Sequence, residues 1–149
     1  MAAIILTVGF MGLIQAVTIC SGMMDQARRE TLAAQILDHE IENLRLESWT
    51  DIQNLTATSP APSIDGQFDD AIKASGATYT LLRSVSNIDP STNTNTAVDT
   101  GLREVTFTLT WIVKTSRRDG SGSPVSFTYT RINSAYFGKN GLNLTYQRS

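Results

Sequence analysis

Residues 1–24 form an apolar run that contains no Asp, Glu, Lys or Arg. As an α-helix this run is about 36 Å long, enough to cross a hydrocarbon layer of about 30 Å. A cleaved secretory signal usually has a basic leader and a shorter apolar core. A buried core helix of this kind needs a larger domain than the rest of the chain can form. The pattern therefore predicts a helix over 1–24 that is covered by lipid or by other helices.

Apolar positions continue beyond residue 24, but on one side only. Charged residues begin at Asp25, and from Leu32 to Leu44 the apolar side chains recur at helical spacing among charged ones. Neither Pro nor Gly occurs from Met23 to Leu55. We therefore predict one continuous helix from Met1 to about Asn54, apolar all round over 1–24 and amphipathic over 25–54.

The next segment predicts a loop and then a short helix. Pro60 and Pro62 lie among Ser, Thr and Ala residues over 56–63, which disfavours helix there. The short helix is expected to have Asp65 as its N-cap and Gly76 as its end. Phe68 and Ile72 fall on one face of this helix.

The remainder alternates between apolar and polar residues in the manner of β-strands. We predict strands over 77–88, 102–114 and 125–132, and the Gly-rich segment 117–124 joins the last two as a hairpin. Residues 141–146 are a candidate edge strand. Arg83 interrupts the apolar positions of the first strand.

These patterns predict an α+β fold in one domain. The amphipathic half of the long helix, 25–54, is expected to pack on a small three- to four-stranded antiparallel β-sheet formed within 55–149. The core between helix and sheet is expected to contain Leu37, Ile41, Leu44, Val105, Phe107, Leu109 and Trp111.

Charge and cysteine content restrict the function. The chain has 12 Lys and Arg against 14 Asp and Glu, a net charge of −2. This balance lacks the basic footprint of a nucleic-acid-binding protein, so no nucleic-acid partner is expected. Cys20 is the only cysteine and lies inside the apolar run, which excludes an intramolecular disulfide.

The sequence contains no recognisable catalytic arrangement. His39, the only histidine, lies among acidic residues of the amphipathic helix, which predicts a solvated charged face. No Ser-His-Asp or Cys-His pattern and no Gly-rich phosphate loop is recognisable. We therefore expect a protein that is not an enzyme and needs no cofactor.

One loop is a candidate calcium site. The segment 89–99 offers side-chain oxygens at Asp89, Asn93, Asn95 and Asp99, and calcium prefers oxygen ligands in flexible geometry. The spacing is not that of an EF-hand. Because Ser, Thr, Asn and Asp are also common turn formers, an ordinary solvated loop is the alternative.

In this arrangement the chain resembles the type IV pilin-like proteins, which include pilins, minor pilins and the pseudopilins of type II secretion. The matching segments are residues 1–10 (MAAIILTVGF), 33–36 (AAQI) and the strand 105–113. Members have a long N-terminal helix, apolar and then amphipathic, followed by a variable loop and a small antiparallel sheet. Some pseudopilins hold calcium in a loop comparable to 89–99.

The resemblance implies a structural subunit of a pilus-like filament. Such a subunit resides in the inner membrane before assembly and then in an extracellular or periplasmic filament. Its partners are copies of itself in a helical homopolymer and the pilus or secretion assembly machinery. The membrane and filament contacts are expected at Ile4, Ile5, Leu6, Val8, Phe10, Met11, Leu13, Ile14, Val17 and Ile19. The alternative is a single-pass membrane-anchored extracytoplasmic binding or signalling domain that does not polymerise.

The chain departs from the family at one position. Family members carry a glutamate at the fifth residue of the mature protein, whereas Ile5 stands there and no acidic residue precedes Asp25. The opening MAAII resembles the segment that follows that glutamate. We therefore expect about six further mature residues and a short basic leader upstream of Met1.

Overall fold

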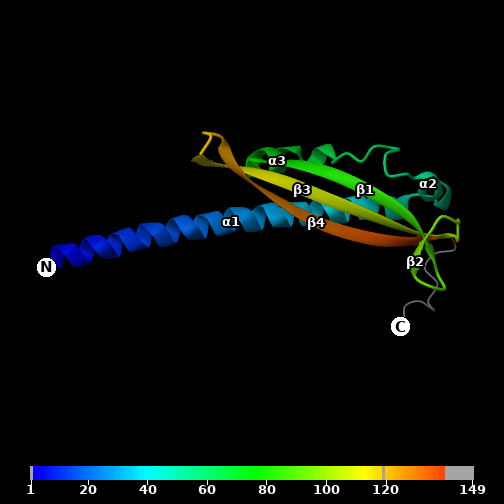
Figure 1. Cartoon of the computed structure of the whole chain (residues 1–149), viewed down its shortest axis with the longest axis horizontal. Coiled ribbons are helices and arrows are strands. Elements are labelled where there is room, and N and C mark those ends of the chain that lie inside the picture. The colour runs from blue at the N-terminus through cyan, green and yellow to red at the C-terminus, as the bar shows by residue number, and fades with distance from the viewer. Residues whose placement is uncertain (1, 119, 140–149) are drawn as a thin grey trace.

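The computed structural model describes residues 2–118 and 120–139, and the side chains of residues 9–115, 118 and 120–139. The chain begins with α1 (Ala2–Leu46), a helix of 45 residues that is about 68 Å long at about 1.5 Å per residue. The first half of α1 projects freely, and the second half lies along the sheet (Figure 1). We call residues 2–24 the rod and residues 25–139 the head.

The prediction of one helix to Asn54 is wrong, because the helix is interrupted. The helix α1 ends at Leu46, and a separate short helix, α2 (Trp49–Asn54), follows. Ser48 between them has extended backbone, and its hydroxyl accepts a hydrogen bond from the Asp51 N–H at 3.3 Å. This N-cap starts a new helix and turns the chain. Ile52 of α2 is buried at the end of the head.

The short helix expected after the loop is confirmed. It consists of the 3₁₀ turn η1 (Gly66–Phe68) and then α3 (Asp69–Ser75). The Asp65 side chain accepts a hydrogen bond from the Gln67 N–H at 2.8 Å. Gly76 ends α3 with φ of 64°, a left-handed conformation that suits glycine.

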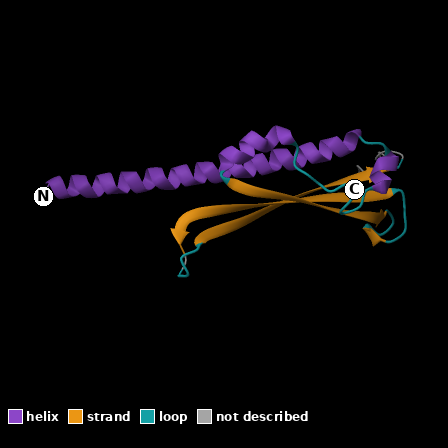
Figure 2. Cartoon of the chain, turned by 90° about the horizontal axis from the view of Figure 1, so that it is seen from above, coloured by secondary structure: helices purple, strands orange, loops and turns teal. Residues whose placement is uncertain are grey.

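The sheet contains β1 (Ala77–Asp89), β2 (Thr94–Thr96), β3 (Leu102–Arg118) and β4 (Pro124–Gly138). The strand order is β2-β1-β3-β4, and each neighbouring pair is antiparallel. Figure 2 shows the sheet as a separate, twisted layer beside the second half of α1. The α+β class is confirmed, with four strands in the described part of the chain.

The strand predictions differ from the structure in length. β3 and β4 run on to Arg118 and Gly138, beyond the predicted ends, because the two strands pair along most of their length. The short edge strand β2 was not predicted, and it pairs with the end of β1. The candidate strand over 141–146 lies outside the described residues.

The core lies between the second half of α1 and the inner face of the sheet. Ala33, Ile36 and Leu37 of α1 are fully buried. All seven residues named above as core candidates lie in this cluster, six of them buried and Leu44 partly buried. Across the strands, Trp111 stacks between Tyr79 and Tyr129, with ring centroids 6.0 and 5.6 Å apart. The core therefore joins the sheet to the second half of α1 through one continuous apolar layer.

Candidate assembly surface

The rod exposes large apolar side chains to solvent in the isolated chain. Their exposed fractions are between 56% and 67% for Phe10, Met11, Leu13, Ile14, Val17, Ile19, Met23 and Met24. Six of these are among the ten predicted membrane and filament contacts. The other four, Ile4, Ile5, Leu6 and Val8, lie outside the residues whose side chains are described. Contiguous exposed apolar patches are typical of interaction sites.

One polar side chain of the rod is satisfied within the helix itself. The Thr18 hydroxyl donates to the Ile14 carbonyl oxygen at 2.9 Å, one turn back along the helix. Gly9, Gly12 and Gly22 lack a side chain, and an added Cβ at each position meets no atom within 4 Å. These glycines leave flat patches on which another helix can approach closely.

Charge begins at the junction of rod and head. Asp25 and Arg28 lie 3.9 Å apart and are both exposed. Within the part of the chain whose side chains the structure describes, no helix is long and apolar enough to span a membrane. The predicted span starts at Met1, and its first eight side chains fall outside that part.

Two contacts hold α3 and β1 to α1 at the junction. The Arg29 Nε donates to the Ser75 carbonyl oxygen at 2.9 Å, and the Tyr79 hydroxyl donates to the Arg29 carbonyl oxygen at 3.5 Å. Further along, the Asn133 amide donates to the Asp38 carboxylate at 3.0 Å. Arg29, adjacent to Arg28, thus marks the point where α3 and β1 first reach α1.

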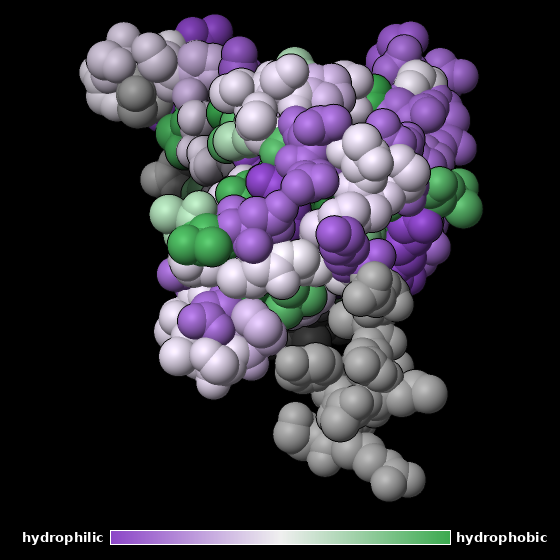
Figure 3. All heavy atoms as spheres, turned by 90° about the vertical axis from the view of Figure 1, so that its right-hand side faces the viewer, coloured by the Kyte–Doolittle hydropathy of each residue, from purple (hydrophilic) through white to green (hydrophobic). Residues whose placement is uncertain are grey.

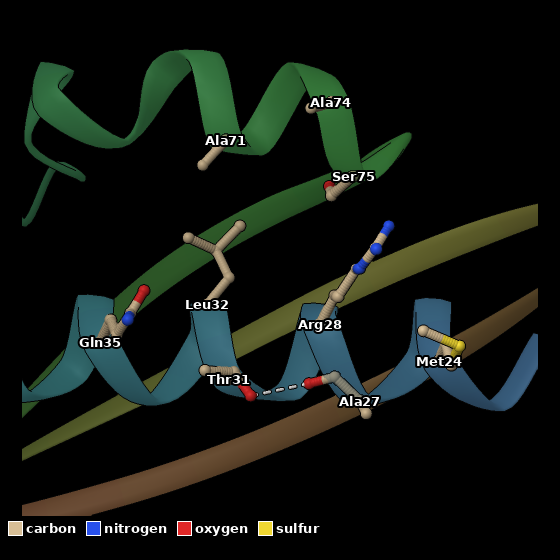
Figure 4. A pocket seen from close by; sticks show the side chains of 9 residues that line it. All are labelled: Met24, Ala27, Arg28, Thr31, Leu32, Gln35, Ala71, Ala74 and Ser75. Carbon is tan, nitrogen blue, oxygen red and sulfur yellow. Dashed lines mark hydrogen bonds between the residues drawn. The ribbon is translucent and has the colours of Figure 1, made fainter.

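A groove of about 580 Å³ lies between α1 and α3 at this junction. Figure 4 shows its walls, with Ala71, Ala74 and Ser75 of α3 on one side and α1 on the other. The α1 wall consists of Met24, Ala27, Arg28, Thr31, Leu32 and Gln35. The α3 side chains that line the groove are small, so the groove is open to a further helix or strand.

The structure explains why Arg83 interrupts the apolar face of β1. Its exposed fraction is 8%, and its Nε and Nη2 donate to the Thr56 carbonyl oxygen at 3.0 and 2.7 Å. Nη2 also donates to the Pro60 carbonyl oxygen. Burial lowers the pKa of Arg83, which the nearby Glu40 carboxylate opposes. Arg83 therefore fastens the loop after α2 to the sheet.

Glu40 of α1 is partly buried near Arg83. Burial raises the pKa of its carboxyl above the ordinary value, and the charges of His39 and Arg83 oppose this shift. The physical cause is the loss of hydration of the carboxylate.

His39 is not simply solvated as predicted. Its Nε2 lies 2.8 Å from the Gln67 amide nitrogen and 3.5 Å from an Asp65 carboxylate oxygen. Its ring also meets Phe68 edge to face, with centroids 5.5 Å apart. The backbone N–H of Gln67 and the hydrogen bond from His39 lower the pKa of Asp65. His39 therefore holds η1 against α1.

The calcium candidates have structural roles in turns. Asp89 accepts hydrogen bonds from the Ser91 hydroxyl and N–H at 2.6 and 2.8 Å, which lower its pKa. Asp99 accepts from the Gly101 N–H at 3.0 Å and the Gln53 amide at 2.6 Å, and its pKa is also lowered. Asn93 has φ of 53°, and Asn95 pairs with Ile88. Among the described residues, no three His, Cys, Asp or Glu side chains gather as a metal site.

The two ends of the molecule have different surfaces. The end of the head remote from the rod presents mostly polar and neutral side chains with scattered apolar ones (Figure 3). The described part of the rod, at the opposite end, carries no charged residue and exposes eight large apolar side chains by more than half. The chain is therefore suited to a water-facing head and a rod that is covered.

Comparison of the chain with profiles of protein families, with curated protein sequences and with solved structures gave no match.

Proposed function

We propose that the chain is a non-enzymatic structural subunit of a pilus-like filament that polymerises through its rod. The observation that carries this proposal is the rod itself. It is uncharged, exposes its large apolar side chains at 56–67%, and belongs to the same unbroken helix that forms the core of the head.

The energetics require that the rod be covered. Each large apolar side chain gains about 1.5–3 kcal/mol on leaving water. The eight such side chains described in the rod cannot reach the core of their own head, because the helix carries them away from it. Lipid of the inner membrane covers the rod before assembly, and other copies replace the lipid in the filament.

The continuity of α1 favours a filament subunit over a membrane-anchored domain. An anchor usually passes into a linker, whereas α1 enters the head without interruption and is buried there at Ala33, Ile36 and Leu37. The head therefore keeps one orientation relative to the rod. A fixed orientation is what a regular helical polymer requires of its subunits.

Electron microscopy of material sheared from cells that produce the chain, with mass spectrometry of the filaments, tests this proposal. The expected result is the chain as a stoichiometric component of an extracellular or periplasmic filament. Permanent residence in the membrane fraction with no filament would instead support the non-polymerising anchored domain.

Gly12 offers a matched pair of variants. Gly12→Asp places a charge in the rod, which costs about 2.5–3.5 kcal/mol on membrane-insertion scales, so insertion or assembly is expected to fail. Gly12→Ala adds a methyl group and no charge, so this variant should still insert and form filaments. A normal filament yield from Gly12→Asp contradicts the proposal.

A further inference from the structure

The groove between α1 and α3 is a recess next to the rod. It measures about 580 Å³, and three of the residues that line it, Ala27, Ala71 and Ala74, have small side chains. In Figure 4 the Ala71 side chain points from α3 toward α1. Small side chains let a third helix approach both α1 and α3 closely.

The chemistry of the groove suits an uncharged occupant. Arg28 is the only charged residue that lines it, and its side chain is 75% exposed beside Asp25. A long arginine side chain can place its charged end in water while its methylene groups cover an apolar neighbour. A helix without charges can therefore enter without burying an unpaired charge.

The exposed surface of the rod continues directly into this groove. Met24 is the last residue of the rod, is 59% exposed, and also lines the groove. The rod of the same chain cannot enter, because α1 is continuous and carries the rod away from α3. The uncharged helix available to a groove of this kind is the rod of another copy.

We infer that the groove between α1 and α3 receives the rod of a second copy of this chain. This inference rests on the proposed function and adds the receiving surface to it. Rod and groove are different surfaces, so the contact is heterologous and leaves a free groove and a free rod at the two ends of any oligomer. Contacts of this type propagate into open filaments when their rotation does not close a ring.

Cysteine crosslinking in assembled filaments tests the contact, since Cys20 is the only native cysteine. Every variant carries Cys20→Ser and Ala74→Cys in the groove. Each variant also has one further cysteine in the rod, placed at a different position between 13 and 24. This scan samples every face of the rod over about three turns. We expect oxidation to produce ladders of linked chains, strongest at rod positions three or four residues apart. A chain that carries the rod cysteine without Ala74→Cys has one thiol and can form only dimers.

Asp70→Cys is the matched control, because Asp70 precedes Ala71 on α3, does not line the groove and has a fully exposed side chain. Ladder yield at the best rod position should be at least about tenfold lower for Asp70→Cys than for Ala74→Cys. Filaments that form normally but give no ladder above this control overturn the groove inference and leave the proposed function standing. A chain that forms no filament at all overturns both.

Discussion

Arg83 supports the clearest quantitative prediction, because it is a buried charge whose hydrogen-bond partners are backbone oxygens. Arg83→Met keeps much of the side-chain volume and removes the hydrogen bonds to Thr56 and Pro60. It also removes the positive charge near Glu40. The expected result is a head that unfolds more easily, starting at the loop after α2.

The size of the effect follows from the geometry. Hydrogen bonds from charged donors contribute about 1.5–3 kcal/mol each. Two of the three share the Thr56 oxygen, and both Thr56 and Pro60 are exposed enough for water to replace the guanidinium. Removing a buried charge also relieves its desolvation. We therefore expect a loss of about 2–3 kcal/mol in the free energy of unfolding, or about 4–12 °C in Tm.

Urea and thermal unfolding in a non-ionic detergent that covers the rod measure this loss, with Trp111 fluorescence reporting the core. Arg45→Met is the matched control, since Arg45 is exposed and pairs only with Glu42; it should change stability by about 0.5 kcal/mol or less. Arg83→Lys keeps the charge without the planar fork and should lose most of the about 2–3 kcal/mol that Arg83→Met loses. Equal unfolding midpoints for Arg83→Met and Arg45→Met would refute this reasoning.

Three further predictions concern the core and its titration. Phe107→Ala, at 1% exposure, should destabilise the head by about 3–5 kcal/mol in urea unfolding, whereas Leu82→Ala, at 58% exposure, should change it by about 0.5 kcal/mol or less. Trp111→Phe removes a buried indole N–H that has no partner among the described residues, so calorimetry should find a loss below about 1.5 kcal/mol despite the smaller ring. Because the pKa of Glu40 is raised in the folded state, the folded chain binds this proton more tightly than the unfolded chain. The free energy of unfolding should therefore fall as the pH rises from the ordinary pKa of 4.5 through the raised pKa of the folded state, and Glu40→Gln should abolish this pH dependence.

Local patterns were sufficient for much of the fold. The absence of charge before Asp25 predicted the rod, and the alternation from Val105 to Trp111 predicted the inner face of β3. Asp65 and Gly76 marked both ends of the short helix. Such features are readable because periodicity and capping depend on residues within a few positions of one another. The break at Ser48 was also readable, since Ser48 and Asp51 have the spacing of a capping box.

Other features depend on residues far apart in the chain. β4 extends to Gly138 because β3 pairs with it, and Arg83 is buried because carbonyl oxygens of the loop 56–60 surround it. His39 contacts η1 only after the loop has brought Gln67 back to α1.

The sequence by itself therefore determined that an uncharged rod precedes an amphipathic helix and a sheet. Tertiary structure alone decided how α3 meets α1, through Arg29 and Ser75, and placed α3 beside α1 to form the groove with Ala74. The physical reason is that a hydrophobic pattern specifies which face of an element is buried. It does not specify which distant element covers that face.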